Sequence, residues 1–325
     1  MASKKLYTET YVQDIADAIR EKAGTSDTMT IAEMAQAIMD IPSGGGGNAE
    51  EIVAGVKIVE ASGKKSFEPV DIDLSGVRLI PSYAYHRLSS GVPPYDASST
   101  EEDNIDRSSN YLPYLGSVSV DDVVCIGSYA FASQEKLTIG SLPATLKRIS
   151  SNAFQGCSLL ALTSIPDGVT IGQAAFQDCK SLKIKELPAG VTLSSTCFRG
   201  CSGITAMDVK ASLKAYGSVF LSCTGLQTLK IRGASCGISS PNNMFKGCTA
   251  LANVWISSSC ATIAADNTSY APFIGCSKLT DIYCETASAP SGFGNYWHYT
   301  GNSTQATVHW GVSEADFDAI VGGNA

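Results

Sequence analysis

The sequence predicts a repeat solenoid that is rich in β-strand, has short helical or 3₁₀ turns, and follows a small N-terminal α-helical segment. The main observation is a phrase of an aromatic residue, a Cys three places later and an aliphatic residue three places further on. Complete copies begin at Phe154, Phe176, Phe198, Phe220, Phe245 and Phe273, and Phe131 begins a copy that lacks the Cys. Successive Phe residues are 23, 22, 22, 22, 25 and 28 positions apart. A period of this size indicates stacked units with an extended surface rather than one catalytic pocket.

Residues 1–43 are expected to form two short helices that attach the chain to something else. The helical spacing is carried by Val12, Ile15, Ala16 and Ile19 in the first helix and by Ile31, Met34, Ala35 and Ile38 in the second. Each helix is too short to be stable alone, so the pair must pack on itself, on other copies or on a partner. Residues 44–50 continue a run of glycines and read as a flexible linker.

Residues 51–290 are expected to form the solenoid, with strands at 52–60 and 70–79. The segment 80–85 matches 126–131 closely enough to be a degenerate first repeat. Between them lies an insertion, about 86–122, rich in Ser, Pro, Tyr and acidic residues. Insertions in repeat proteins map to loops on one face, often a functional one. A passive loop, or a cap over the end of the coil, is the alternative for this insertion.

Within each repeat the aromatic, Cys and aliphatic positions trace one helical or 3₁₀ turn with its apolar side inward. An alternating stretch follows in the later repeats, and period-two alternation places its apolar members in the core. These stretches are Met207-x-Val209, Leu229-x-Ile231, Val254-x-Ile256 and Ile282-x-Cys284. Residues 291–325 are expected to cap the C-terminal end.

The eleven cysteines indicate packing rather than disulfides or zinc. Six of them occupy the same position of the repeat, and the chain contains no Cys-x-x-Cys pair. Stacked repeats would align these thiols in a column inside the coil, where Cys behaves as a small hydrophobe. We therefore expect reduced thiols, no metal and no cofactor.

Composition argues against several partners. The net charge is −8 and the pI is about 4.9, so nucleic acid and anionic membranes would be repelled on average. The N-terminus lacks the apolar core of a secretory signal, and no stretch is long enough to span a bilayer. We expect neither nucleic-acid binding nor membrane insertion.

No pattern of residues indicates catalysis. His86, His298 and His309 are scattered and stand in no known motif. The acidic runs at 101–103 and 121–122 read as solvated loops rather than as a catalytic pair. The sequence therefore predicts a protein that is not an enzyme.

A binding face has more support. The outward positions of the last four alternating stretches are Asp208, Lys230, Trp255 and Tyr283, which should form one column across the sheet. Trp255 and Tyr283 would then be exposed aromatic neighbours that suit a sugar or protein ligand. A flanking loop that covers them is the alternative. Tyr296 and Trp297 belong to a second aromatic concentration, which is either a ligand contact or the hydrophobic cap of the array.

The repeat resembles the BspA-like leucine-rich repeat. The phrase at residues 149–160, Ile-Ser-Ser-Asn-Ala-Phe-Gln-Gly-Cys-Ser-Leu-Leu, is close to that family's pattern, and the resemblance covers about residues 75–290. It departs from the pattern in the two longer last repeats and in the missing Cys after Phe131. The resemblance implies a curved solenoid used for adhesion, with no catalytic residues to carry over. Residues 306–310 followed by 313–321 are similar to the closing strand and short helix of such arrays.

The N-terminal segment is similar to the start of many tailed-phage virion proteins. The similarity lies in residues 14–38 and the glycine run after them. It implies a tail- or baseplate-associated virion protein that binds other virion proteins through residues 1–43, with homo-oligomerisation left open. The solenoid would bind a glycan or protein on the host surface, and the chain, made in the host cytoplasm, would be released by lysis. A cellular BspA-like surface adhesin and a capsid decoration fibre are the alternatives.

Overall fold

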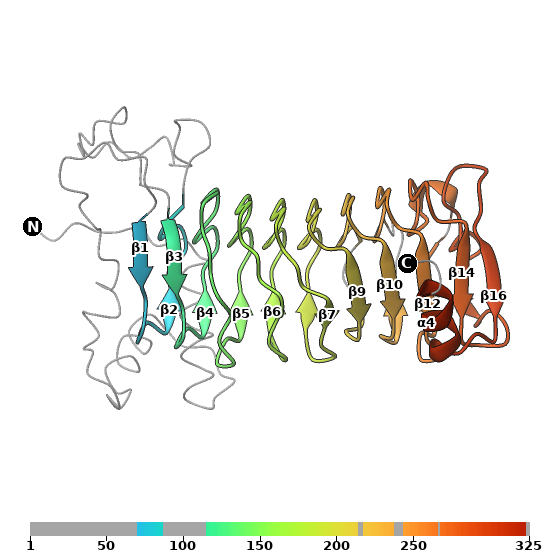
Figure 1. Ribbon diagram of the computed structural model, residues 1–325, viewed down its shortest axis with the longest axis horizontal. Coiled ribbons are helices and arrows are strands. Elements are labelled where there is room, and N and C mark those ends of the chain that lie inside the picture. Colours follow the sequence, from blue (N-terminus) through green and yellow to red (C-terminus); the bar gives the residue numbers. More distant parts are fainter. Residues whose placement is uncertain (1–69, 87–114, 214–216, 237–242, 266, 323–325) are drawn as a thin grey trace, which may run out of the picture.

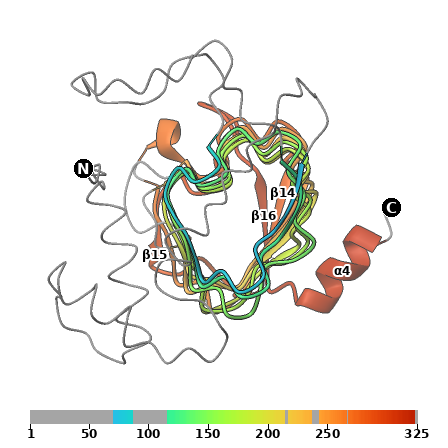
Figure 2. The same ribbon diagram turned by 90° about the vertical axis from the view of Figure 1, so that its left-hand side faces the viewer.

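The protein is a parallel β-solenoid, as the repeat period predicts (Figure 1). The computed structural model describes residues 70–86, 115–213, 217–236, 243–265 and 267–322. Their coils stack along the long axis and, seen along that axis, superimpose as one closed outline (Figure 2). The expected helices of residues 1–43, the linker 44–50, the strand 52–60 and residues 87–114 of the insertion lie outside the described residues.

The longest strands form one side of the solenoid, which we call the long-strand face. Its six-stranded sheet has the order β16-β14-β12-β10-β9-β7, and all neighbouring strands are parallel. The strands are β7 (Glu186–Leu187), β9 (Ala206–Val209), β10 (Thr228–Ile231), β12 (Asn253–Ile256), β14 (Asp281–Cys284) and β16 (Thr307–Trp310). At the N-terminal end, β1 (Val70–Asp73) pairs with β3 (Leu115–Ser119).

Two sheets of two-residue strands form other sides of the coil. One consists of β2 (Leu79–Ile80), β4 (Cys125–Ile126), β5 (Arg148–Ile149), β6 (Thr170–Ile171) and β8 (Thr192–Leu193). The other consists of β11 (Ser235–Cys236), β13 (Thr262–Ile263) and β15 (Gly292–Phe293). The described helices are the 3₁₀ helix η1 (Thr268–Tyr270) and the α-helix α4 (Glu314–Gly322).

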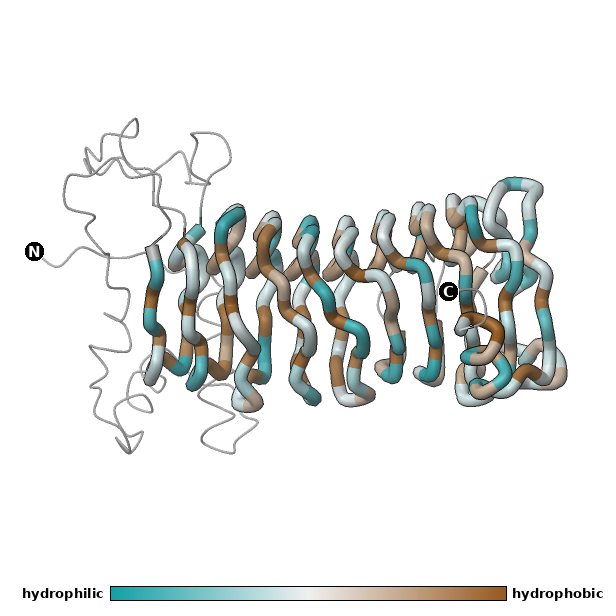
Figure 3. Tube along the Cα trace, in the orientation of Figure 1, coloured by the Kyte–Doolittle hydropathy of each residue, from teal (hydrophilic) through white to brown (hydrophobic). Residues whose placement is uncertain are grey.

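A ladder of aromatic rings runs through the interior. Neighbouring rings are parallel within 12°, and their centroids lie 5.3–5.6 Å apart. The rings belong to Tyr85, Phe131, Phe154, Phe176, Phe198, Phe220, Phe245 and Phe273. Each aromatic residue of the repeat therefore packs on its own counterpart in the next coil. Figure 3 shows the same apolar and polar alternation repeated from coil to coil.

The cysteines of the repeat form a second ladder beside the rings, as the sequence predicts. Each of the six thiols donates a hydrogen bond of 3.0–3.2 Å to the carbonyl oxygen of the repeat Phe in the preceding coil. For example, the Cys201 thiol donates to the Phe176 carbonyl. All eleven cysteines are free and buried, and burial raises the pKa of the Cys201 thiol well above its usual range. The Cys side chain of each repeat thus fills space in the core and donates a hydrogen bond to a buried carbonyl oxygen.

The segment between the Phe and aliphatic positions is a series of tight turns rather than a regular helix. Cys157 N–H donates to the Phe154 carbonyl, and Leu160 N–H donates to the Cys157 carbonyl. Residues with positive φ interrupt these turns, such as Gly156 at +75° and Asp178 at +60°. A left-handed residue ends any continuous helix, which explains the difference from a helical turn.

Two boundaries differ from expectation, and the expected C-terminal elements are present. Residues 115–119, placed within the insertion, form strand β3, because Leu115 and Val118 are buried in the core. The single strand expected at 70–79 is two strands, β1 and β2, in different sheets. The closing strand and short helix expected at 306–310 and 313–321 are confirmed as β16 and α4, and β15 and β16 pair with β13 and β14.

Candidate binding face

The outward positions of the long-strand face lie in one row, as the sequence predicts. Backbone pairing aligns Asp208 with Lys230, Lys230 with Trp255 and Trp255 with Tyr283. Glu186 extends this row at one end and His309 at the other. Neighbouring strands are about 4.8 Å apart, so the six side chains form a closely spaced line. We call this line the outer row.

Helix α4 lies across the C-terminal part of the outer row. It is outside the closed outline of the coil in Figure 2 and in front of β12 in Figure 1. Its first turn is capped by Ser313, whose hydroxyl oxygen accepts from Asp316 N–H at 3.2 Å and donates to the Asp316 carboxylate at 2.6 Å. Phe317 is the buried residue of the helix, and its ring lies 5.7 Å from the Tyr283 ring.

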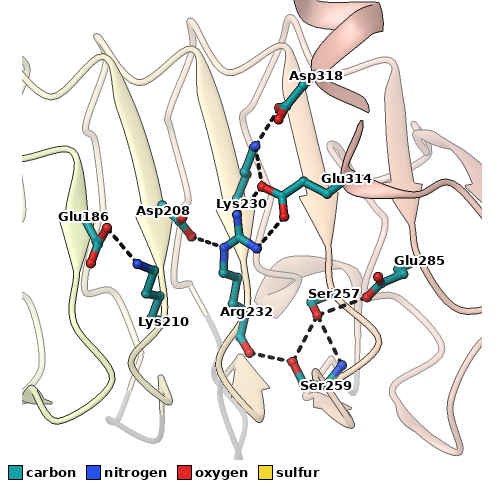
Figure 4. Close-up of polar contacts among 10 residues, drawn as sticks. All are labelled: Glu186, Asp208, Lys210, Lys230, Arg232, Ser257, Ser259, Glu285, Glu314 and Asp318. Carbon is teal, nitrogen blue, oxygen red and sulfur yellow. Dashed lines mark hydrogen bonds and ion pairs between the residues drawn. The ribbon is translucent and has the colours of Figure 1, made fainter. Parts of the chain in front are cut away.

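Ion pairs hold α4 against the sheet (Figure 4). Lys230 Nζ lies 2.8 Å from Glu314 Oε1 and 2.5 Å from Asp318 Oδ1. The Arg232 guanidinium binds Glu314 with two nitrogens, Nη1 at 2.7 Å and Nη2, and its Nε donates to Asp208 at 2.6 Å. Arg232 and Lys230 together lower the pKa of Glu314 to about 2. Bidentate pairing of this kind is the strongest arrangement of a carboxylate with arginine.

Trp255 is buried rather than exposed, which corrects the expectation for this residue. Only 1% of it is exposed. Its indole N–H donates to the Val312 carbonyl at 3.0 Å, and the Arg232 guanidinium lies 5.3 Å from its ring centroid. The covering segment follows β16, so the alternative of a flanking segment over the aromatics is correct for Trp255.

Tyr283 and His309 continue the aromatic part of the row beyond Trp255. Their rings stack at 4.8 Å with an interplanar angle of 16°. His309 Nε2 is 2.7 Å from Asp281 Oδ1. This contact, with a hydrogen bond from Thr280, lowers the pKa of Asp281. The aromatic part of the row therefore ends beside the partly exposed Asp281 carboxylate.

Tyr296 and Trp297 lie away from the outer row, in the C-terminal end of the solenoid. Trp297 is buried and packs against Phe293 and Trp310, with ring centroids at 5.0 and 6.1 Å. Tyr296 is half-buried and its ring meets that of Tyr299 at 5.2 Å. This packing is that of the hydrophobic cap given above as the alternative to a ligand contact.

The N-terminal part of the six-stranded sheet is not covered by α4. Glu186 and Lys210 form an exposed ion pair of 2.9 Å, visible in Figure 4. Lys183 and Lys185 are also exposed. We call these four residues the open stretch.

The repeat pattern does not predict the contact of Arg232 with Glu314, nor the part that Asp318 takes in it. Arg232 follows Lys230 by two positions, and the same alternation that exposes Lys230 places Arg232 on that side. Glu314 and Asp318 are four positions apart and so share one face of a helix. The alternation in the strand and the four-residue spacing in the helix can both be read from the sequence. No periodicity in the sequence, however, predicts that this helix packs against strand β10.

The described residues contain no group of three or more His, Cys, Asp or Glu side chains placed to hold a metal ion. Within the same part of the chain, no helix is long and apolar enough to cross a membrane.

Comparison with known proteins identifies the repeats. A family model described as BspA type leucine rich repeat region matches residues 114–214 and 170–289, more than half of the chain. The chain therefore belongs to the BspA-type leucine-rich repeat family. No curated protein matches it in sequence.

Three solved structures are similar to the chain. A leucine-rich repeat protein of T. pallidum is 21% identical over 52% of this chain and 80% of its own, with a TM-score of 0.36. A leucine-rich cell surface protein of Faecalibacterium prausnitzii is 20% identical over 63% of this chain and 62% of its own, with a TM-score of 0.34. A leucine-rich repeat protein of Bacteroides ovatus is 15% identical over 77% of this chain and 83% of its own, with a TM-score of 0.24.

Proposed function

We propose that the protein is a non-enzymatic adhesin or receptor-binding protein whose solenoid binds a glycan or protein on a host cell surface. The observation that carries this proposal is the long-strand face, where charged side chains stand in register above a tightly packed interior. The ring and thiol ladders hold the strands at a constant spacing, so the outer side chains are pre-organised. The open stretch offers Lys183, Lys185, Glu186 and Lys210 to an extended ligand. Solenoids present binding surfaces of this kind.

The proposal includes a position on a phage particle. Residues 14–38 are similar to the start of tailed-phage virion proteins, and this similarity supports attachment of residues 1–43 to a tail or baseplate. The BspA-type repeats support a cellular surface adhesin equally well. A capsid decoration fibre combines the same attachment segment with the same binding module.

Immunogold labelling distinguishes these positions. An antibody raised against the whole chain is applied to purified phage particles and to the cells that produce the protein. Label at the tail tip supports the tail assignment, and label on the capsid supports the decoration fibre. Label on the cell surface with none on particles overturns both and supports the cellular adhesin.

Charge reversal tests the open stretch. The full chain with Lys183→Glu, Lys185→Glu and Lys210→Glu should lose at least about tenfold in affinity for host cells, because three cations of one face are reversed. Lys147→Glu is the control, since Lys147 is exposed next to β5 in a different sheet. An equal loss in the control, or unchanged binding by the folded triple variant, contradicts a role for this stretch.

A further inference from the structure

We propose that Lys230, Arg232, Trp255 and Tyr283 form a second binding site, for acidic glycans, and that α4 occupies this site until the glycan displaces it. We call these four residues the covered site. The inference rests on the proposed function, because it names a ligand class for the same face of the solenoid. It differs in place, since the open stretch lies outside the helix contact.

The covered site combines two cationic side chains, which can bind carboxylates, with two aromatic side chains, which can pack against a ring of the ligand. If α4 leaves, Lys230 loses Glu314 and Asp318, and the Arg232 guanidinium loses Glu314 but keeps its hydrogen bond to Asp208 and its place over the Trp255 ring. The guanidinium then presents two free nitrogens, an arrangement that binds a carboxylate bidentately.

The floor of the site is aromatic. Displacement of the helix together with Val312, which precedes it, would free the Trp255 indole N–H from the Val312 carbonyl and would uncover the Tyr283 ring from Phe317. The Arg232 guanidinium lies over the Trp255 ring. Aromatic rings that combine a flat apolar face with a polar tip are common at sites where one side of the ligand is apolar and the other is wet. An acidic sugar has an apolar ring face, which can pack on the aromatic side chains, and a carboxylate, which can bind Lys230 and Arg232.

The helix displays the same chemistry as the proposed ligand. Glu314 and Asp318 place two carboxylates on one side of α4, with the Phe317 ring between them in the sequence. Lys230 Nζ lies 5.8 Å from the centroid of that ring. The chain thus fills its own cationic and aromatic site with carboxylates and one ring, and a ligand that replaces the helix must supply the same groups.

The attachment of α4 is weak enough to be displaced. The helix has nine residues and one buried side chain, and helices of that length are marginal without tertiary contacts. The side chain of Asp318 is 54% exposed and that of Glu314 is 35% exposed, so water and salt weaken both ion pairs. Gly311 precedes the helix with φ of +74°, a conformation that glycine adopts without strain.

A glycan is favoured over an acidic peptide because of how the row continues. A peptide helix that repeats the contacts of α4 must compete with a tethered helix at high effective concentration. A chain of sugars that runs along the outer row would gain contacts beyond those of α4, at the His309 ring next to Tyr283 and, through its hydroxyl groups, at Asp208. Several linked contacts of this kind allow an external polymer to displace the helix.

Polygalacturonate, a polymer of acidic sugars, is the probe for this site, and binding is measured by calorimetry on the full chain. Glu314→Gln with Asp318→Asn removes both carboxylates from α4 and should raise the affinity about tenfold or more. The matched control, Glu135→Gln with Asp178→Asn, makes the same charge change elsewhere and should leave the affinity unchanged. Adding Arg232→Gln and Lys230→Gln to the first variant should abolish the gain.

Hydrogen exchange gives the second measurement. Saturating polygalacturonate should remove amide protection from residues 317–321 of the unmodified chain, because the glycan displaces the helix. Unchanged protection, or no gain in affinity when the two carboxylates are removed, overturns the proposal.

Two further probes identify the ligand class. Poly-glutamate that binds the uncovered variant while polygalacturonate does not would overturn the proposal in favour of an acidic peptide. Dextran, a neutral glycan, should not bind, and equal binding of dextran would overturn the role of the carboxylates. Loss of host-cell binding through the open stretch tests the proposed function separately, since none of these measurements uses cells.

Discussion

The interior and the outer row of the same coils follow opposite rules. In the interior each ring meets a copy of itself, as Phe176 meets Phe198 at 5.5 Å. On the outside each position differs from its neighbour, and Arg232 finds its main partner, Glu314, 82 residues away. The repeated interior positions therefore determine the coil. The contacts between α4 and the outer row, which do not recur from coil to coil, determine which part of the long-strand face is exposed. The two kinds of contact should respond differently to the same substitution.

The largest effect is expected from breaking the interior ladder. Phe198→Ala removes a fully buried ring that is stacked on both sides, and should lower the free energy of unfolding by about 4 kcal/mol. Urea denaturation measures this loss. The neighbouring exposed residue gives the control, and Arg199→Ala should change stability by less than about 0.5 kcal/mol. Similar losses for both variants would contradict the contrast between inside and outside.

Close stacking of the coils should also exclude a methyl group at Gly225. A Cβ there would lie 1.9 Å from the Ser202 carbonyl oxygen of the preceding coil, so Gly225→Ala should cost about 2–3 kcal/mol. Gly140→Ala is the matched control, because a Cβ at Gly140 meets nothing within 4 Å. Thermal unfolding of the two variants should therefore separate them clearly. Equal midpoints would show that the coils can move apart at no cost.

The same Phe→Ala change outside the coil should have a smaller and local effect. Phe317→Ala removes the buried anchor of α4, and the helix can leave the sheet without opening the solenoid. We expect faster hydrogen exchange in residues 314–322 and greater quenching of Trp255 fluorescence, with global stability lowered by about 1 kcal/mol or less. Ile320→Ala, at an exposed position of the same helix, should change neither signal. A loss as large as that of Phe198→Ala would mean that α4 belongs to the cooperative core.

Acid should weaken the helix contact by the smallest amount. The usual pKa of Glu314 is 4.5, and Arg232 and Lys230 lower it to about 2 in the folded chain. The charged form is thus favoured by docking. Its contribution is complete above pH 4.5 and is lost as the pH falls from 4.5 through about 2.

Solvent screens this exposed pair, so the expected change in Trp255 fluorescence is modest. Glu314→Gln should remove the part of the change that titrates between pH 4.5 and 2. An identical titration in that variant would assign the change to another group, such as Asp281, whose pKa is also lowered.

The repeated part of the molecule could be predicted because each repeat contains the same pattern of buried residues. Phe, Cys and an aliphatic residue at constant spacing gave the buried columns, and period-two alternation gave the register of Asp208, Lys230, Trp255 and Tyr283. The position of α4 could not be predicted in the same way. It depends on pairing between Lys230 or Arg232 and carboxylates that follow the last strand, and no pattern in the sequence links them. Strand β3 could not be predicted because residues 86–114, which precede it, carry no copy of the repeat phrase.

The reach of α4 has a consequence for how such a chain can change in length. A duplicated repeat inserted between β5 and β6 would lengthen the stack by one coil, about 4.8 Å, and leave every contact of the helix in place. The same duplication between β10 and β12 would move Lys230 and Arg232 one coil farther from Glu314 and separate the pairs. The contacts of α4 thus fix the number of coils between β10 and the C-terminus. Only the part of the array before β10 can gain or lose repeats without breaking these contacts.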